Sequence, residues 1–284
     1  MAAIRQATEP PRELAKVMTC TVYLVGAGPG PVDLLTLRAA RIIAQANVLI
    51  YDALVTQEVL NLAPKATLIN VGKRAGLASA AQQDINKVLV SQALIARSEN
   101  KTIVRLKGGD ALIFARAEEE ISALREAGIE FEVVSGITAA QAAFAAIKVP
   151  LTKRGIQRSA VLATAQVQKG GDIGTAWARP IVAAGGGAIY MAASAASRIK
   201  GTLLALGMPA HTPVTWVGNA GFESSMQCCQ TLQSLQNPEF INNPPVILLI
   251  GAEPEHIKKR KISQWTQPTS STLLGLSAPA LSLA

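Results

Sequence analysis

Glycine-rich and charged segments follow four short apolar runs in the first half of the chain, and such segments can bind a small ligand. The first is GAGPG at 26–30, which follows the apolar run VYLV at 22–25. A strand that turns through glycines into a helix lets a ligand approach the bare backbone. The other segments are VGKRAG at 71–76, RLKGGD at 105–110 and SGITAA at 135–140. Because the carboxyl ends of parallel strands line one crevice, the four segments predict a shared binding site.

The first turn does not carry the complete glycine pattern of dinucleotide-binding proteins. That fingerprint needs glycine at the first, third and sixth positions; Gly26 and Gly28 fit, but the sixth residue is Pro31. Pro29 also removes a backbone N–H donor, which weakens a phosphate cradle. A nicotinamide dehydrogenase is therefore the disfavoured alternative, which selective NAD binding would revive. Taken alone, the glycine pair is also compatible with a tight turn that has a structural role and binds no ligand.

Alternating strands and helices would position these segments. Apolar runs predict strands over 20–25, 47–51, 67–71, 101–106 and 130–134. Helical periodicity predicts helices over 34–46, 56–62, 81–97, 116–127 and 138–147. We expect Asp33 to cap the first helix and Gly128 to end the fourth. The alternation is typical of a parallel sheet with helices on its faces.

The second half predicts a mixed α/β domain. Strands are expected over 158–164, 187–191, 213–218, 225–231 and 245–250, and a helix over 194–206. The two strands within 213–231 have no helix between them, which predicts an antiparallel hairpin. We therefore divide the chain into an N-terminal arm (1–18), a parallel-sheet α/β domain (19–149), a mixed α/β domain (150–262) and a tail (263–284).

Composition excludes several classes of protein. In the 284 residues, no apolar run reaches the ~18–20 residues of a membrane span. The first residues do not have the apolar stretch of a secretory signal. We therefore expect a cytoplasmic protein without a membrane partner. Three cysteines and two histidines without ligand-like spacing predict no metal site. The net charge of +8 is dispersed and aromatic residues make up 4%, which disfavours nucleic acid as a partner. Several cations fall at the predicted strand ends, including Lys73, Arg105 and Lys107, which favours an acidic small molecule.

The motifs GAGPG, YDALV, VGKRAG, RLKGGD and SGITAA, in this order, resemble the uroporphyrinogen-III C-methyltransferase family over about residues 20–252. GAGPG and GGD are shared with the wider precorrin methyltransferases and diphthine synthase, whereas YDALV and VGKRAG are more specific. The resemblance implies a homodimer with the two-domain tetrapyrrole-methylase fold and a cofactor cleft between the domains. It also implies transfer of methyl groups from S-adenosyl-L-methionine to two ring carbons of uroporphyrinogen III, an acidic tetrapyrrole. The products would be precorrin-2, on the route to sirohaem and cobalamin, and S-adenosyl-L-homocysteine.

The resemblance also assigns individual residues. It makes Asp52 the proton acceptor and Lys73 the proton donor; the structural alternatives are a helix cap for Asp52 and a solvated surface charge for Lys73. Its cofactor-binding residues fall on Pro29, Gly108, Gly109, Asp110, Ile113, Thr138, Ala139, Met191 and Ala220. Our candidates for binding the substrate carboxylates are Arg38, Arg116, Arg154 and Arg158.

The chain departs from the family pattern near the third motif and after the linker. Ala111, Ala115 and Glu118 replace a proline and two glycines, which predicts a more helical segment. Lys153 and Gln166 stand where histidine is common. These departures leave two alternatives open: a methyltransferase that acts on a later precorrin, and a binding or regulatory relative with weak turnover.

Overall fold

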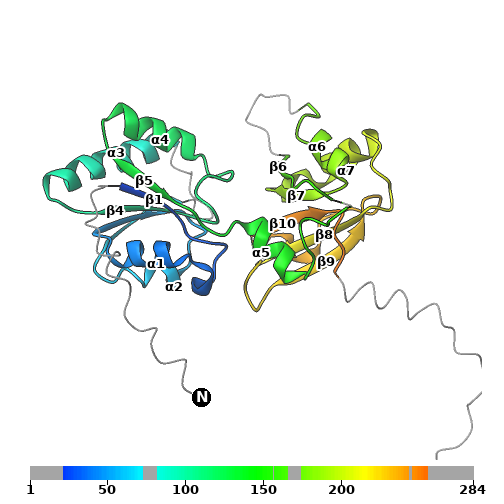
Figure 1. The fold of residues 1–284 in the computed structure, drawn as a ribbon, viewed down its shortest axis with the longest axis horizontal. Coiled ribbons are helices and arrows are strands. Elements are labelled where there is room, and N and C mark those ends of the chain that lie inside the picture. Colours follow the sequence, from blue (N-terminus) through cyan, green and yellow to red (C-terminus); the bar gives the residue numbers. More distant parts are fainter. Residues whose placement is uncertain (1–21, 73–81, 156, 166–173, 243–244, 255–284) are drawn as a thin grey trace, which may run out of the picture.

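Two five-stranded sheets make up the fold in the computed structural model (Figure 1). The structure describes residues 22–72, 82–155, 157–165, 174–242 and 245–254. The first sheet is wholly parallel, in the order β3-β2-β4-β1-β5. The second is mixed, in the order β6-β7-β10-β8-β9. The predicted fold class is confirmed on both counts.

The first sheet is covered by helices on both faces. Its strands are β1 (Val22–Gly26), β2 (Val48–Tyr51), β3 (Thr67–Asn70), β4 (Ile103–Lys107) and β5 (Phe131–Val134). Its helices are α1 (Leu37–Ala44), α2 (Gln57–Leu60), α3 (Gln82–Ser98) and α4 (Ala117–Glu126). Because side chains alternate along a strand, Tyr23 and Val25 pack in the cluster under α1 and α2, whereas Val22 and Leu24 pack under α3 and α4. Such double coverage explains why β1 and β2 are continuous apolar runs.

The first helix begins later than predicted. Asp33 lies in a 3₁₀ turn, η2 (Val32–Leu34), and Leu35 is extended, so Asp33 does not cap α1 and that prediction is wrong. The cap is Thr36, whose Oγ1 accepts a hydrogen bond from the Ala39 N–H at 3.1 Å. Gly128 ends α4 in the left-handed region (φ 64°), as predicted.

The second sheet consists of β6 (Leu162–Thr164), β7 (Gly187–Tyr190), β8 (Pro213–Gly218), β9 (Met226–Thr231) and β10 (Val246–Ile250). β8 and β9 pair antiparallel, which confirms the predicted hairpin. Two short 3₁₀ turns, η3 (Ala193–Ala195) and η4 (Glu239–Asn242), accompany the helices α6 (Arg179–Ala184) and α7 (Ala196–Ala205). We had not predicted α6, which has Pro180 in its first turn and ends at left-handed Gly185 (φ 69°).

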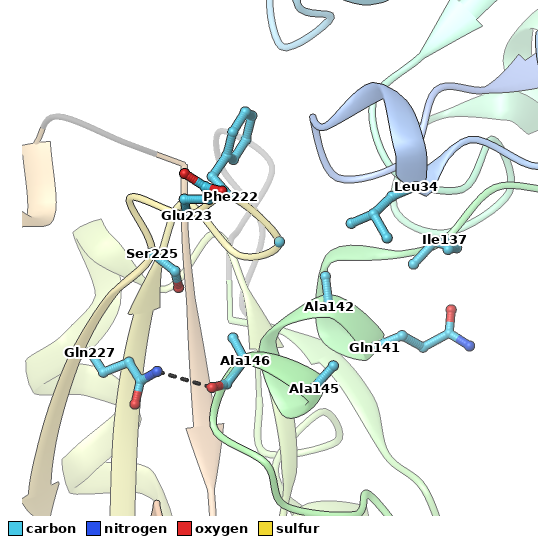
Figure 2. Close-up of a pocket in the computed structure, with 11 residues that line it drawn as sticks. Leu34, Ile137, Gln141, Ala142, Ala145, Ala146, Phe222, Glu223, Ser225 and Gln227 are labelled. Carbon is cyan, nitrogen blue, oxygen red and sulfur yellow. Dashed lines mark hydrogen bonds between the residues drawn. The ribbon is translucent and has the colours of Figure 1, made fainter.

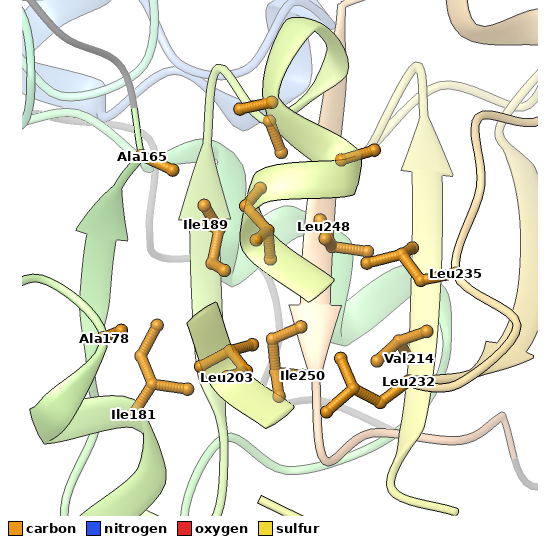
Figure 3. Close-up of a cluster of buried hydrophobic side chains, with 14 of the residues drawn as sticks. Ala165, Ala178, Ile181, Ile189, Leu203, Val214, Leu232, Leu235, Leu248 and Ile250 are labelled. Atoms are coloured by element: carbon orange, nitrogen blue, oxygen red, sulfur yellow. The ribbon is translucent and has the colours of Figure 1, made fainter. Parts of the chain in front are cut away.

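An aliphatic core lies between the second sheet and the helices α6 and α7 (Figure 3). Ile181 and Leu203 project from the helices towards Ile189, Leu248 and Ile250 on the strands. All five are buried, so the helices pack as a layer on this face of the sheet.

Helix α5 (Ala139–Ala146) joins the two sheets. It follows β5 of the first sheet, but its buried Ala143 and Phe144 pack with Val217 and Leu249 of the second sheet. Its N-terminus therefore lies at the strand ends of one sheet while its body rests on the other. The domain boundary at 149/150 stays a prediction, and the predicted arm and tail lie outside the described residues. Among the described helices, none is long and apolar enough to cross a membrane.

Candidate active site

A cavity of about 260 Å³ lies at the carboxyl ends of the first sheet's strands and is closed by residues after β7. Its walls include Asp52 from the first sheet and Tyr190 and Pro245 from the second. The predicted cofactor residues that line it are Pro29, Gly108, Gly109, Asp110, Ile113, Thr138, Ala139 and Met191. Ala220 is the exception, because it is buried among the side chains that pack against α5. Segments from both halves of the sequence thus share one cavity.

Glycines allow three loops to meet at the floor of this cavity. Gly28 and Gly109 exchange two backbone hydrogen bonds, at 3.0 and 2.7 Å, and both have positive φ. A Cβ at Gly26 would lie 2.7 Å from the backbone of Gly136. Because the Gly28 N–H is already bonded to Gly109, it is not available to cradle a phosphate. The turn therefore does not act as a dinucleotide fingerprint.

Asp110 fixes the geometry of these loops. Its Oδ1 accepts from the Leu112 N–H and its Oδ2 accepts from the Gly136 N–H, both at 2.9 Å. The carboxylate therefore ties the loop after β4 to the loop after β5. The segment 111–116 that follows forms turns, so the prediction of greater helicity is wrong there. Phe114 and Arg116 have positive φ values of 52° and 55°, which only the surrounding structure can hold.

Tyr190 is a cavity residue that the sequence did not single out. Its hydroxyl lies 2.5 Å from Thr138 Oγ1 and accepts from the Ala140 N–H at 3.2 Å, at the start of α5. Its ring centroid lies 4.9 Å from that of Phe114. Tyr190 thus links β7 to the cavity-lining start of α5. The only hint in the sequence was its position directly before Met191.

We predict that Tyr190 titrates above its ordinary pKa of 10.0, because burial raises the pKa of its phenol. With the folded pKa raised, the phenol stabilises the fold below pH ~10, and this contribution is lost as pH rises through the folded pKa. The difference in tyrosinate absorbance between wild type and Tyr190→Phe should therefore develop above pH ~10. Unfolding measurements should show wild type losing more stability than Tyr190→Phe over that range. Titration of Tyr190 at or below pH ~10 would contradict the burial argument.

Four charged side chains meet beside the cavity. Arg105 and Lys107 are two residues apart on β4 and project to the same face of the sheet. Both bind Glu120 Oε1 of α4, Arg105 through Nη2 at 2.9 Å and Lys107 through Nζ at 2.8 Å. Arg105 Nη2 also donates to Asp52 Oδ1 at 2.6 Å. Asp52 alone of the four reaches the cavity. It is not a helix cap, since α2 begins at Gln57, which removes that alternative.

Burial dominates the electrostatics of this cluster. Arg105 and Lys107 are 1% exposed and Glu120 is 0% exposed, so they are core residues and not the substrate-facing cations that we expected at strand ends. Burial lowers the pKa of Lys107 and Arg105 lowers it further, whereas Glu120 and Asp52 raise it. Of these four side chains, only that of Asp52, which is 31% exposed, can present a charge to a ligand.

The other predicted polar residues do not gather in the cavity. Arg38 pairs with Glu132 at the surface, and Arg116 pairs with Glu119 through bonds of 2.7 and 2.8 Å. Arg154 and Arg158 are exposed, and none of the four arginines lines the cavity. Lys73 and Gln166 lie outside the described residues, so the proton-donor role of Lys73 stays a prediction. Within the described part of the chain, no cluster of side chains could hold a metal ion.

A larger hollow of about 650 Å³ lies on the other side of α5, towards the β8–β9 turn (Figure 2). Leu34 and Phe222 face it, and Gln227 Nε2 donates to the Ala146 carbonyl at 3.1 Å. Glu223 is the one acidic side chain among its lining residues, and no basic one lines it. The hollow therefore has no means of moving a proton between two groups, and we place the chemistry in the smaller cavity.

Comparison with known proteins decides the family. Residues 21–235 match the model of the Tetrapyrrole (Corrin/Porphyrin) Methylases. The chain belongs to the tetrapyrrole methylase family. This membership agrees with the parallel first sheet, the mixed second sheet and the cavity between them.

The relatives differ in length. A uroporphyrinogen-III C-methyltransferase of Pseudomonas aeruginosa is 39% identical over 248 residues, covering 87% of this chain and 99% of that protein. A siroheme synthase 1 of Klebsiella pneumoniae is 39% identical over 277 residues, covering 97% of this chain but 56% of that protein. The tetrapyrrole methylase described here thus spans about half the length of the siroheme synthases that it matches.

Solved structures share the fold. Uroporphyrin-III C-methyltransferase from Thermus thermophilus, complexed with S-adenosylhomocysteine, is 31% identical with a TM-score of 0.69. The match covers 84% of this chain and 99% of that chain. A cobalt precorrin-4 methyltransferase is 22% identical with a TM-score of 0.67, a likeness of fold alone.

Proposed function

We propose that this tetrapyrrole methylase transfers methyl groups from S-adenosyl-L-methionine to two ring carbons of uroporphyrinogen III, giving precorrin-2. The observation that carries the proposal is the cavity that gathers Pro29, Gly109, Thr138 and Met191 beside the carboxylate of Asp52. The relative of nearly equal length and the Thermus thermophilus structure support the same activity.

The cavity residues fit S-adenosyl-L-methionine. Backbone and small side chains from Gly108, Gly109 and Ala139 leave room for a ligand where larger side chains would fill the space. A Cβ at Gly108 would already lie 3.2 Å from Leu54 Cβ. Pro29, Ile113 and Met191 add apolar contacts, and Met191 is 43% exposed, which leaves its thioether open to a ligand. These residues would hold the cofactor, which supplies an electrophilic methyl group when bound.

The protein has two tasks in such a reaction. The first is to hold the pyrrole carbon and the methyl group in line at near contact, which can lower the barrier by about 7–11 kcal/mol. The second is to accept a proton that the macrocycle loses at another position once the new C–C bond has formed and the C–S electron pair has stayed on sulfur. The methylated ring carbon has no hydrogen to lose, because every β-carbon of this substrate already carries a side chain. Asp52 can accept this proton, because Arg105 holds its Oδ1 while the carboxylate stays at the cavity wall. The resemblance implies that Lys73 donates a proton during the accompanying shift of double bonds; a second proton then leaves the macrocycle, so that each methyl transfer releases one proton net.

One assay tests the proposal. Purified protein is incubated with methyl-labelled S-adenosyl-L-methionine and uroporphyrinogen III, and the products are identified by mass spectrometry. We expect two methyl groups per macrocycle. The substrate assignment would be overturned if uroporphyrinogen III gained no methyl groups while a later precorrin, tested in the same way, did.

The departures from the family pattern at Ala111, Ala115 and Glu118 favour a second candidate, a relative that binds but has weak turnover. Phe114 and Arg116 hold positive φ in this segment, next to the cavity. Calorimetric binding of S-adenosylhomocysteine without any methyl transfer would support that candidate.

We further propose that the enzyme acts as a cytoplasmic homodimer, as the family resemblance implies. Leu37, which is 84% exposed and lies outside the cavity, is an apolar side chain that association would cover. Analytical ultracentrifugation would test the dimer, and a monomer at all concentrations would exclude it.

A further inference from the structure

Glu120 is a buried acid that the proposed reaction does not use directly. Its Oε1 accepts from Arg105 Nε at 3.1 Å, Arg105 Nη2 at 2.9 Å and Lys107 Nζ at 2.8 Å, while its buried Oε2 accepts no hydrogen bond from any described residue. Glu120 comes from α4, which packs on the face of the first sheet to which Val22 and Leu24 project. It does not line the cavity, so it cannot touch a ligand there.

Such a cluster needs a reason beyond stability. Central strands of parallel sheets normally bury apolar side chains on both faces, and β4 instead buries Arg105 and Lys107. Replacing a buried ion-pair network with apolar residues is often neutral or stabilising. The network is therefore better explained by what it does for the one member that faces the cavity, which is Asp52.

The geometry connects Glu120 to Asp52 through a single guanidinium. Arg105 Nη2 donates to Glu120 Oε1 at 2.9 Å and to Asp52 Oδ1 at 2.6 Å. The guanidinium is therefore held by both carboxylates. Lys107 is also held on Glu120, although the charge of Asp52 is near enough to act on Lys107. Without Glu120, Asp52 would be the only acid among the described residues that pairs with Arg105, and Lys107 would lose its counter-ion. Asp52 would be drawn towards Lys107 and away from the cavity.

We propose that Glu120 is a positioning residue that holds Arg105 and Lys107 so that Arg105 presents the Asp52 carboxylate to the cavity. This inference rests on the proposed function, because the role of Asp52 as proton acceptor is part of it. Glu120 touches neither cofactor nor substrate, so its loss should reduce turnover and leave cofactor affinity unchanged.

The first test compares two Glu→Gln substitutions on α4. Glu120→Gln removes the buried charge, and Glu126→Gln removes an exposed charge at the end of the same helix. We expect Glu120→Gln to lower kcat by about 10- to 100-fold, as misplacement of a reacting group does, with the Kd for S-adenosylhomocysteine within about twofold of wild type. Glu126→Gln should leave both quantities unchanged. Equal effects of the two substitutions on kcat would overturn the proposal.

A double-mutant cycle separates positioning from a general loss of structure. If Glu120 acts through Asp52, adding Glu120→Gln to Asp52→Asn should cause no further loss of kcat. Losses that multiply would overturn the proposal. Glu120→Asp keeps the charge and should therefore be more active than Glu120→Gln. If Glu120→Gln does not bind S-adenosylhomocysteine, Glu120→Asp takes its place in the cycle. An inactive wild type would refute the proposed function itself, whereas an active wild type with unchanged Glu120→Gln refutes only the positioning role.

Discussion

Replacing Asp52 with asparagine is expected to remove most methyl transfer while leaving the binding of S-adenosylhomocysteine almost unchanged. The amide keeps the size of the side chain and an oxygen that can accept from Arg105 Nη2, now 2.6 Å away, so the cavity wall should persist. An amide cannot take up a proton as a carboxylate does, and losing a general base lowers turnover by about 10²–10⁴-fold. Steady-state kcat with labelled cofactor and calorimetric Kd measure the two quantities.

Asp84→Asn is the matched control for this experiment. Asp84 is an exposed residue of α3 that pairs with Lys87 at 3.6 Å, and surface pairs of this kind contribute little. Its substitution makes the same chemical change outside the cavity and should alter neither kcat nor Kd. If Asp52→Asn lost cofactor affinity and turnover equally, or lost neither, Asp52 would not be the base.

Local sequence rules predicted the fold and the floor of the cavity well. A turn that ends a strand forms where glycines can adopt positive φ, which is a local property of the sequence. The turns at 26–30 and 108–110 could therefore be predicted from the sequence alone. The same holds for the apolar strands, whose observed ends match the predicted ones closely except for β6. Convergence of the predicted cofactor residues followed from the rule that parallel strands end at one edge.

Partners distant in the sequence set the rest of the site, and no local pattern reveals them. Tyr190 bonds Thr138 across 52 positions, and Arg105 bonds Asp52 across 53. The sequence predicted that Arg105 and Lys107 lie at strand ends and face an acidic small molecule. That prediction is wrong, because Glu120 allows both cations to be buried. The prediction for Asp33 was wrong for a local reason: the 3₁₀ turn delays the start of α1, and Thr36 is the residue that caps it.

Replacing Gly136 with alanine is expected to disrupt the loops that form the floor of the cavity. Its Cβ would lie 2.3 Å from the Gly109 carbonyl oxygen and 2.9 Å from Gly26 Cα, all backbone atoms that cannot rotate away. The Gly136 N–H also donates to Asp110 Oδ2 at 2.9 Å, so displacement of Gly136 would loosen the loop after β4.

Gly136→Ala should therefore reduce the free energy of unfolding by about 3 kcal/mol or more and weaken S-adenosylhomocysteine binding together with it. Gly201→Ala is the contrasting variant, because Gly201 lies inside α7 with nothing within 4 Å of an added Cβ. It should stabilise the protein by about 0.5–1 kcal/mol through helix propensity and leave binding unchanged. Urea unfolding and calorimetry of both variants make the comparison. Similar free energies of unfolding for the two would mean that the three glycine loops are not in the close contact from which the cavity is built.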